Sequence, residues 1–345
     1  MNRTWFITGG AGFIGSNYTD RLVGRGEAVV VYDNLSRAGA AANITWLRSR
    51  HGCDSFRLIE GDIRDAALLE KAVRAADVIV HLAGQVAVTT SVLEPREDFE
   101  VNALGTLNLL EAARLGDRNP VVVYASTNKV YGGVDSVEVE EQATRFWSLR
   151  LPNGVPETCA LEFNSPYGCS KGVGDHYARA YHQIYGLPTV VLRQSCIYGP
   201  RQFGIEDQGW MAWFAIAALC GQPITIFGNG KQIRDVLEVN DLMDCYDLAV
   251  ECIATAAGKA YNVGGGPDNA ISVWHEFGPM LEGLLGCEIP VRFEDWRPGD
   301  QRYFVSDIRC ATREFDWRPS ISKVDGIRTL VDWVRDHQDV LRVVS

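Results

Sequence analysis

The sequence contains no CxxC pair of cysteines and no closely spaced pair of histidines. Its nine cysteines are odd in number, so we expect reduced thiols in a cytoplasmic protein rather than a disulfide framework. Because paired thiols and imidazoles are the usual zinc ligands, their absence also means that no metal site is expected.

Long apolar runs are missing too, because no stretch approaches the roughly 20 residues that a transmembrane helix requires. Met1-Asn2-Arg3-Thr4 leads directly into an apolar segment, so no signal peptide is expected. Positive charge is scarce relative to negative, and the formal net charge is −11. Such a chain has no general attraction for nucleic acid or an anionic membrane, although it can still contain a local basic pocket for a phosphate.

The first half of the sequence alternates short apolar runs with helical patterns. This alternation predicts parallel β-α-β units in a sheet that helices cover on both faces. We therefore expect an α/β fold with a Rossmann-type, doubly wound parallel sheet. The expected strands are 5–8, 28–32, 56–59, 78–82, 121–124 and 189–192, and the expected helices are 17–25, 66–75, 102–115 and 169–184.

After about residue 195 the sequence pattern changes, and loops rich in Gly, Trp and Arg separate shorter elements. A length of 345 residues suits one large α/β unit or two unequal lobes. We expect residues 1–194 to form the Rossmann domain and residues 195–345 to form a smaller C-terminal substrate-binding lobe. No linker separates the two, so the boundary is soft and the chain can cross it again.

A glycine-rich stretch, TGGAGFIGS at residues 8–16, follows the first expected strand and precedes a helix. Gly9, Gly12 and Gly15 would let the backbone approach a pyrophosphate, with the helix N-terminus facing the anion. Asp33 ends the second strand 18 residues after Gly15, where a carboxylate accepts hydrogen bonds from the adenosine ribose hydroxyls. Asp33 would also repel a 2′-phosphate, which favours NAD over NADP, whereas nearby Arg37 keeps NADP as an alternative.

Two later segments fit the same dinucleotide site. Gly61-Asp62-Ile63 follows a strand and could reach the adenine edge, and HLAGQ at 81–85 places small residues where a flat ring could lie on the backbone. The complete set of expected cofactor contacts is Gly9, Gly12, Phe13, Ile14, Gly15, Asp33, Asn34, Arg37, Asp62, Ile63, Leu82, Ala83, Gln85, Asn102, Tyr167 and Lys171.

The segment SPYGCSK, residues 165–171, places Tyr167 and Lys171 four residues apart and so on one face of a helix. An ammonium near a phenol lowers the tyrosine pKa from about 10 toward neutrality, and a phenolate can take the proton of a sugar hydroxyl. The spacing alone favours an ordinary surface Tyr–Lys pair. Thr127, at the end of a strand in ASTNKVYGG (125–133), changes this interpretation because its hydroxyl can share the same substrate oxygen.

The glycine motif, Asp33, Thr127 with Val130-Tyr131-Gly132, and Tyr167-x-x-x-Lys171 together resemble the extended short-chain dehydrogenase/reductase family. Its members are nucleotide-sugar epimerases and dehydratases, and the resemblance covers essentially the whole chain. It implies that Thr127, Tyr167 and Lys171 are the catalytic trio and that NAD is held tightly and is not consumed. It also implies a homodimer or homotetramer formed through the tyrosine-bearing helices.

Asn128 and Lys129 distinguish the chain from the dehydratases of that family, in which an Asp-Glu pair follows the threonine and removes water. An amide does not titrate and a lysine is cationic, so neither residue can act as that acid–base pair at neutral pH. The resemblance therefore implies epimerisation through a keto sugar. Asn128 and Lys129 are then expected to hydrogen-bond neighbouring hydroxyls of this intermediate.

Two longer segments, 151–172 and 201–214, most resemble family members that invert C2 of a CDP-hexose. Cys196 stands where the UDP-galactose 4-epimerases usually carry an asparagine, which argues against UDP handling of that type. A UDP-hexose 4-epimerase, a 2-epimerase for another nucleotide sugar and a non-catalytic NAD-sensing regulator stay open as alternatives. Arginine forks suit a diphosphate, and the expected nucleotide-sugar contacts are Gln85, Arg201, Arg234 and Arg302.

Overall fold

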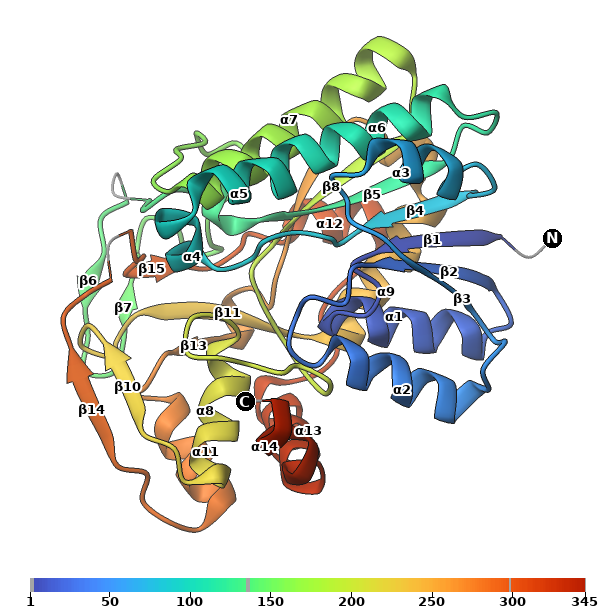
Figure 1. Ribbon diagram of the computed structural model, residues 1–345. Coiled ribbons are helices and arrows are strands. Elements are labelled where there is room, and N and C mark those ends of the chain that lie inside the picture. The colour runs from blue at the N-terminus through green and yellow to red at the C-terminus, as the bar shows by residue number, and fades with distance from the viewer. Residues whose placement is uncertain (1–2, 135–136, 298, 345) are drawn as a thin grey trace. The chain divides into compact units, whose positions relative to one another are not determined.

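The computed structural model describes residues 3–134, 137–297 and 299–344 (Figure 1). The chain forms two compact units, each assembled from three segments. Unit 1 consists of Met1–Thr127, Ser165–Arg193 and Met243–Tyr261, and unit 2 consists of Asn128–Asn164, Gln194–Leu242 and Asn262–Ser345.

Unit 1 is built on a seven-stranded sheet with the strand order β12-β8-β5-β4-β1-β2-β3. The β1–β2, β1–β4, β2–β3 and β4–β5 pairs are all parallel. The strand order reverses next to β1, which is the doubly wound topology that the sequence predicted. The strands are β1 (Thr4–Thr8), β2 (Ala28–Asp33), β3 (Arg57–Glu60), β4 (Val78–His81), β5 (Val121–Thr127), β8 (Thr189–Gln194) and β12 (Ala260–Val263).

The central strands consist of continuous apolar residues because helices cover both faces of this sheet. In Figure 1, α3, α6 and α7 lie over one face, whereas α1 and α2 lie over the other. All four residues of β4 are buried between these layers. The helices are α1 (Phe13–Gly24), α2 (Ala40–His51), α3 (Ala66–Ala72), α4 (Val88–Leu93), α5 (Pro95–Phe99), α6 (Gly105–Leu115), α7 (Pro166–Tyr185), α9 (Val239–Glu251) and α10 (Ile253–Ala256).

Three helices in unit 1 begin differently from the sequence-based prediction. Helix α1, expected at 17–25, begins at Phe13. The helix expected at 102–115 starts as a π-helical turn, η1 (Glu100–Leu104), which continues directly into α6. Helix α7 starts at Pro166, because the Ser165 side chain accepts a hydrogen bond from the Gly168 N–H at 3.1 Å and caps the first turn. Tyr167 therefore lies in the first turn of α7.

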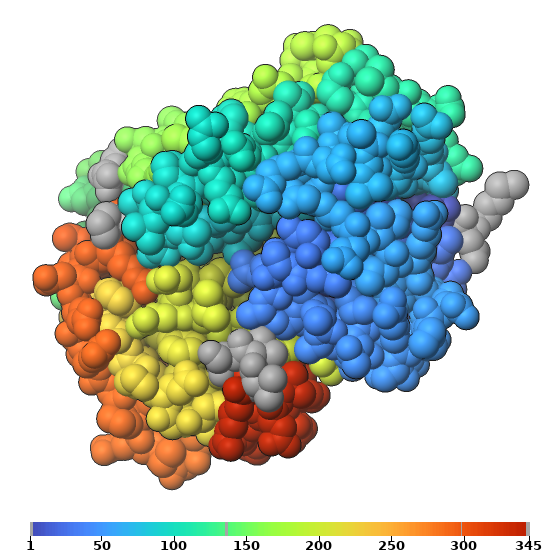
Figure 2. Space-filling model, in the orientation of Figure 1, coloured from blue at the N-terminus to red at the C-terminus, as the bar shows by residue number. Residues whose placement is uncertain are grey.

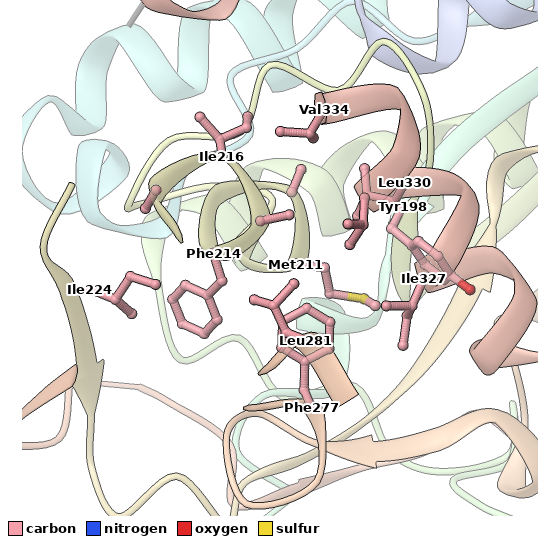
Figure 3. Close-up of a cluster of buried hydrophobic side chains, with 14 of the residues drawn as sticks. Tyr198, Met211, Phe214, Ile216, Ile224, Phe277, Leu281, Ile327, Leu330 and Val334 are labelled. Atoms are coloured by element: carbon pink, nitrogen blue, oxygen red, sulfur yellow. The ribbon is translucent and has the colours of Figure 1, made fainter. Parts of the chain in front are cut away.

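Unit 2 contains short strands and a group of helices around its own hydrophobic core. Figure 3 shows this core, in which Met211 and Phe214 of α8 meet Phe277 of α11 and Leu330 of α13. The helices are α8 (Trp210–Cys220), α11 (Phe277–Leu285), α12 (Arg309–Phe315), α13 (Lys323–Asp336) and α14 (Gln338–Val344), with 3₁₀ turns η2 (Asn128–Tyr131) and η3 (Pro267–Asn269). The strands are β6 (Glu140–Glu141), β7 (Phe146–Trp147), β9 (Cys196–Tyr198), β10 (Ile224–Phe227), β11 (Ile233–Glu238), β13 (Ala270–Ser272), β14 (Val291–Glu294) and β15 (Tyr303–Phe304).

The chain passes between the units more often than a single boundary at residue 195 describes. Residues 128–164 belong to unit 2 because their backbone pairs with it. The Phe146 N–H donates to the Lys231 carbonyl at 3.0 Å, and the Val155 N–H donates to the Val305 carbonyl at 2.7 Å.

Residues 243–261 return to unit 1, because most of α9 lies against α1. There the Tyr18 hydroxyl donates to Asp247 Oδ1 at 2.8 Å. Arg21 of α1 and Arg25, the residue that follows this helix, form ion pairs with the same carboxylate. The Rossmann unit thus receives a helix from a segment that follows the expected boundary.

Candidate active site

The glycine turn between β1 and α1 leaves no room for side chains. Gly9 has a φ of 67°, and a Cβ placed there would lie 2.7 Å from the Ala83 nitrogen. A Cβ on Gly15 would overlap the Gly9 carbonyl oxygen. Gly12 occupies the N-cap position of α1 and provides no side-chain cap, so the first N–H groups of the helix face an open turn. This cradle fits the pyrophosphate of a dinucleotide.

Asp33 is tied to this turn by the backbone. Its Oδ2 accepts a hydrogen bond from the Ala11 N–H at 3.0 Å, and its Oδ1 accepts one from the Leu35 N–H at 2.8 Å. Burial raises the pKa of Asp33, whereas these two N–H groups and the Arg37 charge act in the opposite direction. The carboxylate therefore has a fixed orientation at the end of β2.

Asn34 and Asp62 form a second polar group beside Asp33. The Asn34 amide donates to Asp62 Oδ2 at 3.1 Å, and the Arg64 guanidinium donates to both oxygens of Asp62 at 2.8 Å. The fork of Arg64 holds the pKa of Asp62 well below its usual range. Ile63, the next residue in the chain, is buried, and Arg64 was not among the predicted site residues.

The segment after β4 is positioned by side chains that the sequence analysis did not identify. The Leu82 and Ala83 N–H groups donate to Thr8 Oγ1 at 3.2 and 3.1 Å. The Thr8 hydroxyl in turn lies 2.7 Å from Nδ1 of the buried His81. Burial lowers the pKa of His81 to about 3, so this imidazole is neutral and holds the loop through hydrogen bonds.

Asn102, from the π-helical turn η1, fixes the backbone of Gln85 from both sides. Its Oδ1 accepts from the Gln85 N–H at 2.9 Å, and its Nδ2 donates to the Gln85 carbonyl at 3.0 Å. The Gln85 side chain turns back onto Ala87, bonding both its N–H and its carbonyl. In this arrangement Asn102 supports the loop at Gln85.

Thr127, Tyr167 and Lys171 come together at the end of β5 and the start of α7. Each of the three is 8% exposed, and Tyr167 shares a hydrogen bond with Thr127. The Lys171 ammonium lies 4.6 Å from the centre of the Tyr124 ring, and the Tyr124 hydroxyl donates to the Lys171 carbonyl at 3.1 Å. The sequence spacing therefore corresponds to a real cluster in unit 1.

The pKa values in this cluster differ from the simple expectation of a lysine that acidifies a tyrosine. Burial raises the pKa of Tyr167 to about 12, although Thr127 and Arg37 act to lower it. Burial also lowers the pKa of Lys171 to about 8, against the opposing effect of Asp98 and Asp175. In the protein chain alone, desolvation therefore outweighs the favourable charges.

A buried ion pair lies next to this cluster. Arg193 of β8 donates to both oxygens of Asp175 of α7, at 2.8 and 3.1 Å, and Ser126 adds a third hydrogen bond at 3.0 Å. All three residues are buried. Since Ser126 precedes Thr127 and Asp175 lies one helical turn after Lys171, this pair braces both elements of the cluster.

In unit 2, Lys129 and Arg234 are joined through Asp300 and Gln301. Lys129 Nζ donates to Gln301 Oε1 at 3.2 Å, and Arg234 donates to Asp300 Oδ1 at 2.7 Å. Burial lowers the pKa of Lys129 to about 8, and the charge of Arg234 adds to this effect. Asn128 is buried at the start of η2, next to Lys129 in the chain.

The other two predicted substrate arginines lie elsewhere in unit 2. Arg201 has a φ of 69°, and its guanidinium lies 5.7 Å from the ring centre of Trp333 in α13. Arg302 lies against the rings of Phe146 and Trp296, at 5.7 and 5.5 Å from their centres. Each guanidinium is thus held against an aromatic face rather than in the group formed by Lys129 and Arg234.

In the part of the chain that the structure describes, His, Cys, Asp and Glu side chains do not gather in threes as a metal centre would require. All nine cysteines are free thiols. Within the same residues, no helix has the length and apolar character needed to cross a membrane.

Comparison with known proteins identifies the class. The family model described as GDP-mannose 4,6 dehydratase matches residues 6–330. CDP-paratose 2-epimerase from Salmonella typhi is 44% identical over 336 residues, which cover 95% of this chain and 98% of the relative. The chain belongs to this family, within the extended short-chain dehydrogenases/reductases, as the sequence predicted. It is therefore an enzyme of the NAD-dependent nucleotide-sugar epimerase/dehydratase type.

Solved structures agree with this assignment. The dTDP-glucose 4,6-dehydratase from Streptomyces venezuelae, with NAD bound, has a TM-score of 0.85 and 30% identity, and the match covers 99% of this chain and 100% of that chain. The UDP-glucuronic acid 4-epimerase from Bacillus cereus, in complex with UDP-glucuronic acid and NAD, has a TM-score of 0.81 and 28% identity, over 96% and 99% of the two chains. The predicted cofactor, NAD, is confirmed by these neighbours.

Proposed function

We propose that this enzyme is an epimerase that inverts C2 of a CDP-hexose through a transient 2-keto sugar. The observation that carries the proposal is the 44% identity to CDP-paratose 2-epimerase over 95% of the chain. The residues that follow Thr127 support it. The Asn128 amide does not titrate, so this pair lacks the two carboxyl groups with which the dehydratases of the family remove water.

In the proposed mechanism, Tyr167 as phenolate takes the proton of the 2-hydroxyl, and Thr127 holds the same oxygen by a hydrogen bond. NAD, when bound, would supply reversible hydride transfer at C2 and the positive charge of its oxidised ring. Because burial places the pKa of Tyr167 at about 12, the phenolate needs nearby cations. The Arg37 charge already lowers this pKa, and we assign the same effect to protonated Lys171, one helical turn after Tyr167. The tyrosine then returns the proton to the inverted alcohol, so no group is consumed.

Asn128 and Lys129 are assigned to the keto intermediate. The Lys129 ammonium donates to the Gln301 amide, a neutral partner that leaves its charge in place, and we assign this charge to oxygen atoms of the sugar. Burial makes such donors more effective than they would be in water. Their proposed role is to orient the sugar and to stabilise its oxygens while C2 is a ketone.

The nucleotide part of the substrate is assigned to three arginines and to Gln85. Arg234 is buried and already oriented by Asp300, which suits bidentate contact with a diphosphate. Arg302, Arg201 and Gln85 complete the proposed substrate contacts. The cofactor contacts are assigned to the residues predicted from the sequence, from the glycine turn to Tyr167 and Lys171.

We further assign a homodimer or homotetramer to the face formed by α6 and α7. These helices carry exposed apolar residues that would be unfavourable in water, namely Leu115, Tyr177, Ile184 and Tyr185. The green to yellow-green surface in Figure 2 includes part of this face. A cytoplasmic location also belongs to the proposal, since the free thiols suit a reducing compartment.

Proton NMR of the purified protein with CDP-paratose in deuterium oxide, without added cofactor, tests the reaction. The C2 epimer should appear with its C2 hydrogen undiluted by deuterium, because the hydrogen never exchanges with solvent. Deuterium at C2 would instead indicate proton abstraction and refute the redox mechanism. Turnover of UDP-hexoses in place of CDP-sugars would establish the UDP-sugar alternative.

A further inference from the structure

A buried carboxylate that the proposed mechanism does not use lies in α5, which packs against α7, the helix that carries Tyr167 and Lys171. Asp98, in the short helix α5, is only 1% exposed. Its Oδ1 accepts a hydrogen bond from Asn102 Nδ2 at 3.0 Å, whereas its Oδ2 is buried without a hydrogen-bond partner. A carboxylate in this position is costly unless a positive charge compensates it.

The surrounding contacts connect Asp98 to α7. The same Asn102 amide donates to Ser170 Oγ at 3.2 Å, and the Ser170 hydroxyl donates to the Tyr167 carbonyl at 3.2 Å. Helices α5 and α7 and the turn η1 pack against one another. Asp98 is therefore joined, through neutral side chains, to the first turn of the helix that carries Tyr167 and Lys171.

Lys171 is the cation whose charge acts on Asp98. The titratable groups that act on Lys171 come from β4, β5, α5 and α7, and they are His81, Tyr124, Asp98 and Asp175. His81 is neutral, because burial holds its pKa at about 3. Asp175 is already paired in a fork with Arg193. Asp98 is the carboxylate of this group whose hydrogen-bond partners are all neutral.

We propose that Asp98 is a positioning residue that serves as the buried counter-charge of Lys171 and keeps this lysine protonated beside Tyr167. The inference rests on the proposed function, because it gives Asp98 a task only if Lys171 must be a cation during the reaction. Its carboxylate favours the ammonium form of Lys171 and disfavours the phenolate form of Tyr167. Removing the charge should therefore lower the pKa of both residues.

The test compares Asp98→Asn with the wild type as NAD-containing holoproteins. An asparagine keeps an oxygen acceptor for Asn102 and removes only the charge. The chain has six lysines, so ¹³Cε-lysine labelling gives few NMR signals, and Lys171→Arg identifies the signal of Lys171. In Asp98→Asn the titration midpoint of Lys171 should fall by about one pH unit. Both limbs of the kcat/KM profile should move to lower pH with it.

Glu97→Gln is the matched control, because it removes a negative charge from an exposed position of the same helix. It should leave the Lys171 midpoint within about 0.2 pH units of the wild type, since solvent screens this charge. Lys129 is an internal reference, because Asp98 is not among the groups that set its pKa. If Asp98→Asn does not fold, the Lys171 midpoint is compared between the wild type and Asp98→Ser, which also keeps a hydrogen-bond acceptor.

An unmoved or raised Lys171 midpoint in Asp98→Asn overturns the inference, as does an equal shift in Glu97→Gln. The NMR titration needs no substrate, so it is independent of whether CDP-sugars are turned over. A wild-type protein that epimerises CDP-paratose while Asp98→Asn leaves Lys171 unchanged would refute only the role of Asp98. If the Lys171 midpoint falls in Asp98→Asn but the wild-type protein does not convert CDP-sugars, only the assigned substrate is refuted.

Discussion

Lys129 and Gln301 are 172 residues apart in the sequence, and the Lys129 ammonium donates to the Gln301 amide oxygen at 3.2 Å. The other end of that amide donates to the Gly132 carbonyl, so its orientation is fixed. A neutral acceptor holds the lysine without neutralising it. Burial and the Arg234 charge can therefore lower the pKa of Lys129 to about 8.

Lys129→Met should lower kcat for the CDP-sugar by about 10- to 100-fold, because it removes the proposed donors to the keto sugar while keeping the apolar stem. Steady-state kinetics at pH 7 would measure the loss. Lys231→Met is the matched control, because it removes a lysine of the same unit that pairs with Glu141, and its kcat should stay within about twofold. An unchanged kcat in Lys129→Met would remove this residue from the mechanism.

Lys129 should also make stability depend on pH in a defined window. Its folded-state pKa of about 8 lies below the unfolded value of about 10.4, so between these values the unfolded chain binds more protons. Stability from this group therefore rises with pH from about 8 to 10.4, and the charged lysine is a cost below pH 8.

Lys129→Met should accordingly unfold at a higher temperature than the wild type at pH 7, by roughly 2–4 °C for each kcal/mol removed. The difference in unfolding temperature between the two proteins should become smaller between about pH 8 and pH 10. Calorimetry of both proteins across this range checks the sign. A gap that stays constant or widens with pH would show that Lys129 is not held at a lowered pKa.

Tyr167→Phe should reduce turnover by about 100- to 10,000-fold, because it deletes the proposed general base without changing the ring. Tyr177→Phe on the same helix is the control, because phenylalanine keeps the ring at the proposed subunit face and removes only a hydroxyl, so the rate should stay unchanged. NAD released from each denatured protein should be equal. A Tyr167→Phe variant with the wild-type rate would show that another group acts as the base.

The sequence predicted most of the Rossmann unit, because its strands are continuous apolar runs and its glycine turn has few structural alternatives. Helix α2 was not predicted. Its twelve residues, Ala40–His51, mix alanine with asparagine, threonine and arginine, and they show no clear apolar stripe. The sequence also did not predict that α9 belongs to unit 1, because this depends on the hydrogen bond from Tyr18 to Asp247, 229 residues later.

At the site, the four-residue spacing predicted that Tyr167 and Lys171 share a helix face, and both lie in α7. The hydrogen bond between Tyr167 and Thr127 joins this helix to the end of β5. The direction of the Tyr167 pKa was not predictable, since burial is the largest cause and burial depends on the whole fold. Asp98 and Gln301 were missed for a related reason. Their importance comes from partners on other elements, and neither belongs to a recognisable pattern.

The glycine cradle gives the last prediction. In Gly15→Ala the new Cβ would overlap the Gly9 carbonyl oxygen, so the turn must open and the backbone loses its close approach to the pyrophosphate. The purified variant should contain at least tenfold less NAD, as measured by chromatography of the released nucleotide.

Gly24→Ala provides the control at the other end of α1, where the nearest atom to an added Cβ is His51 Cε1 at 4.0 Å. This variant should keep its NAD and gain up to about 1 kcal/mol of stability, because alanine loses less backbone entropy than glycine in a helix. A Gly15→Ala protein with a full complement of NAD would mean that the turn tolerates a side chain. The cofactor would then be held mainly by contacts beyond the glycine turn, of which the fixed Asp33 carboxylate is the first to test.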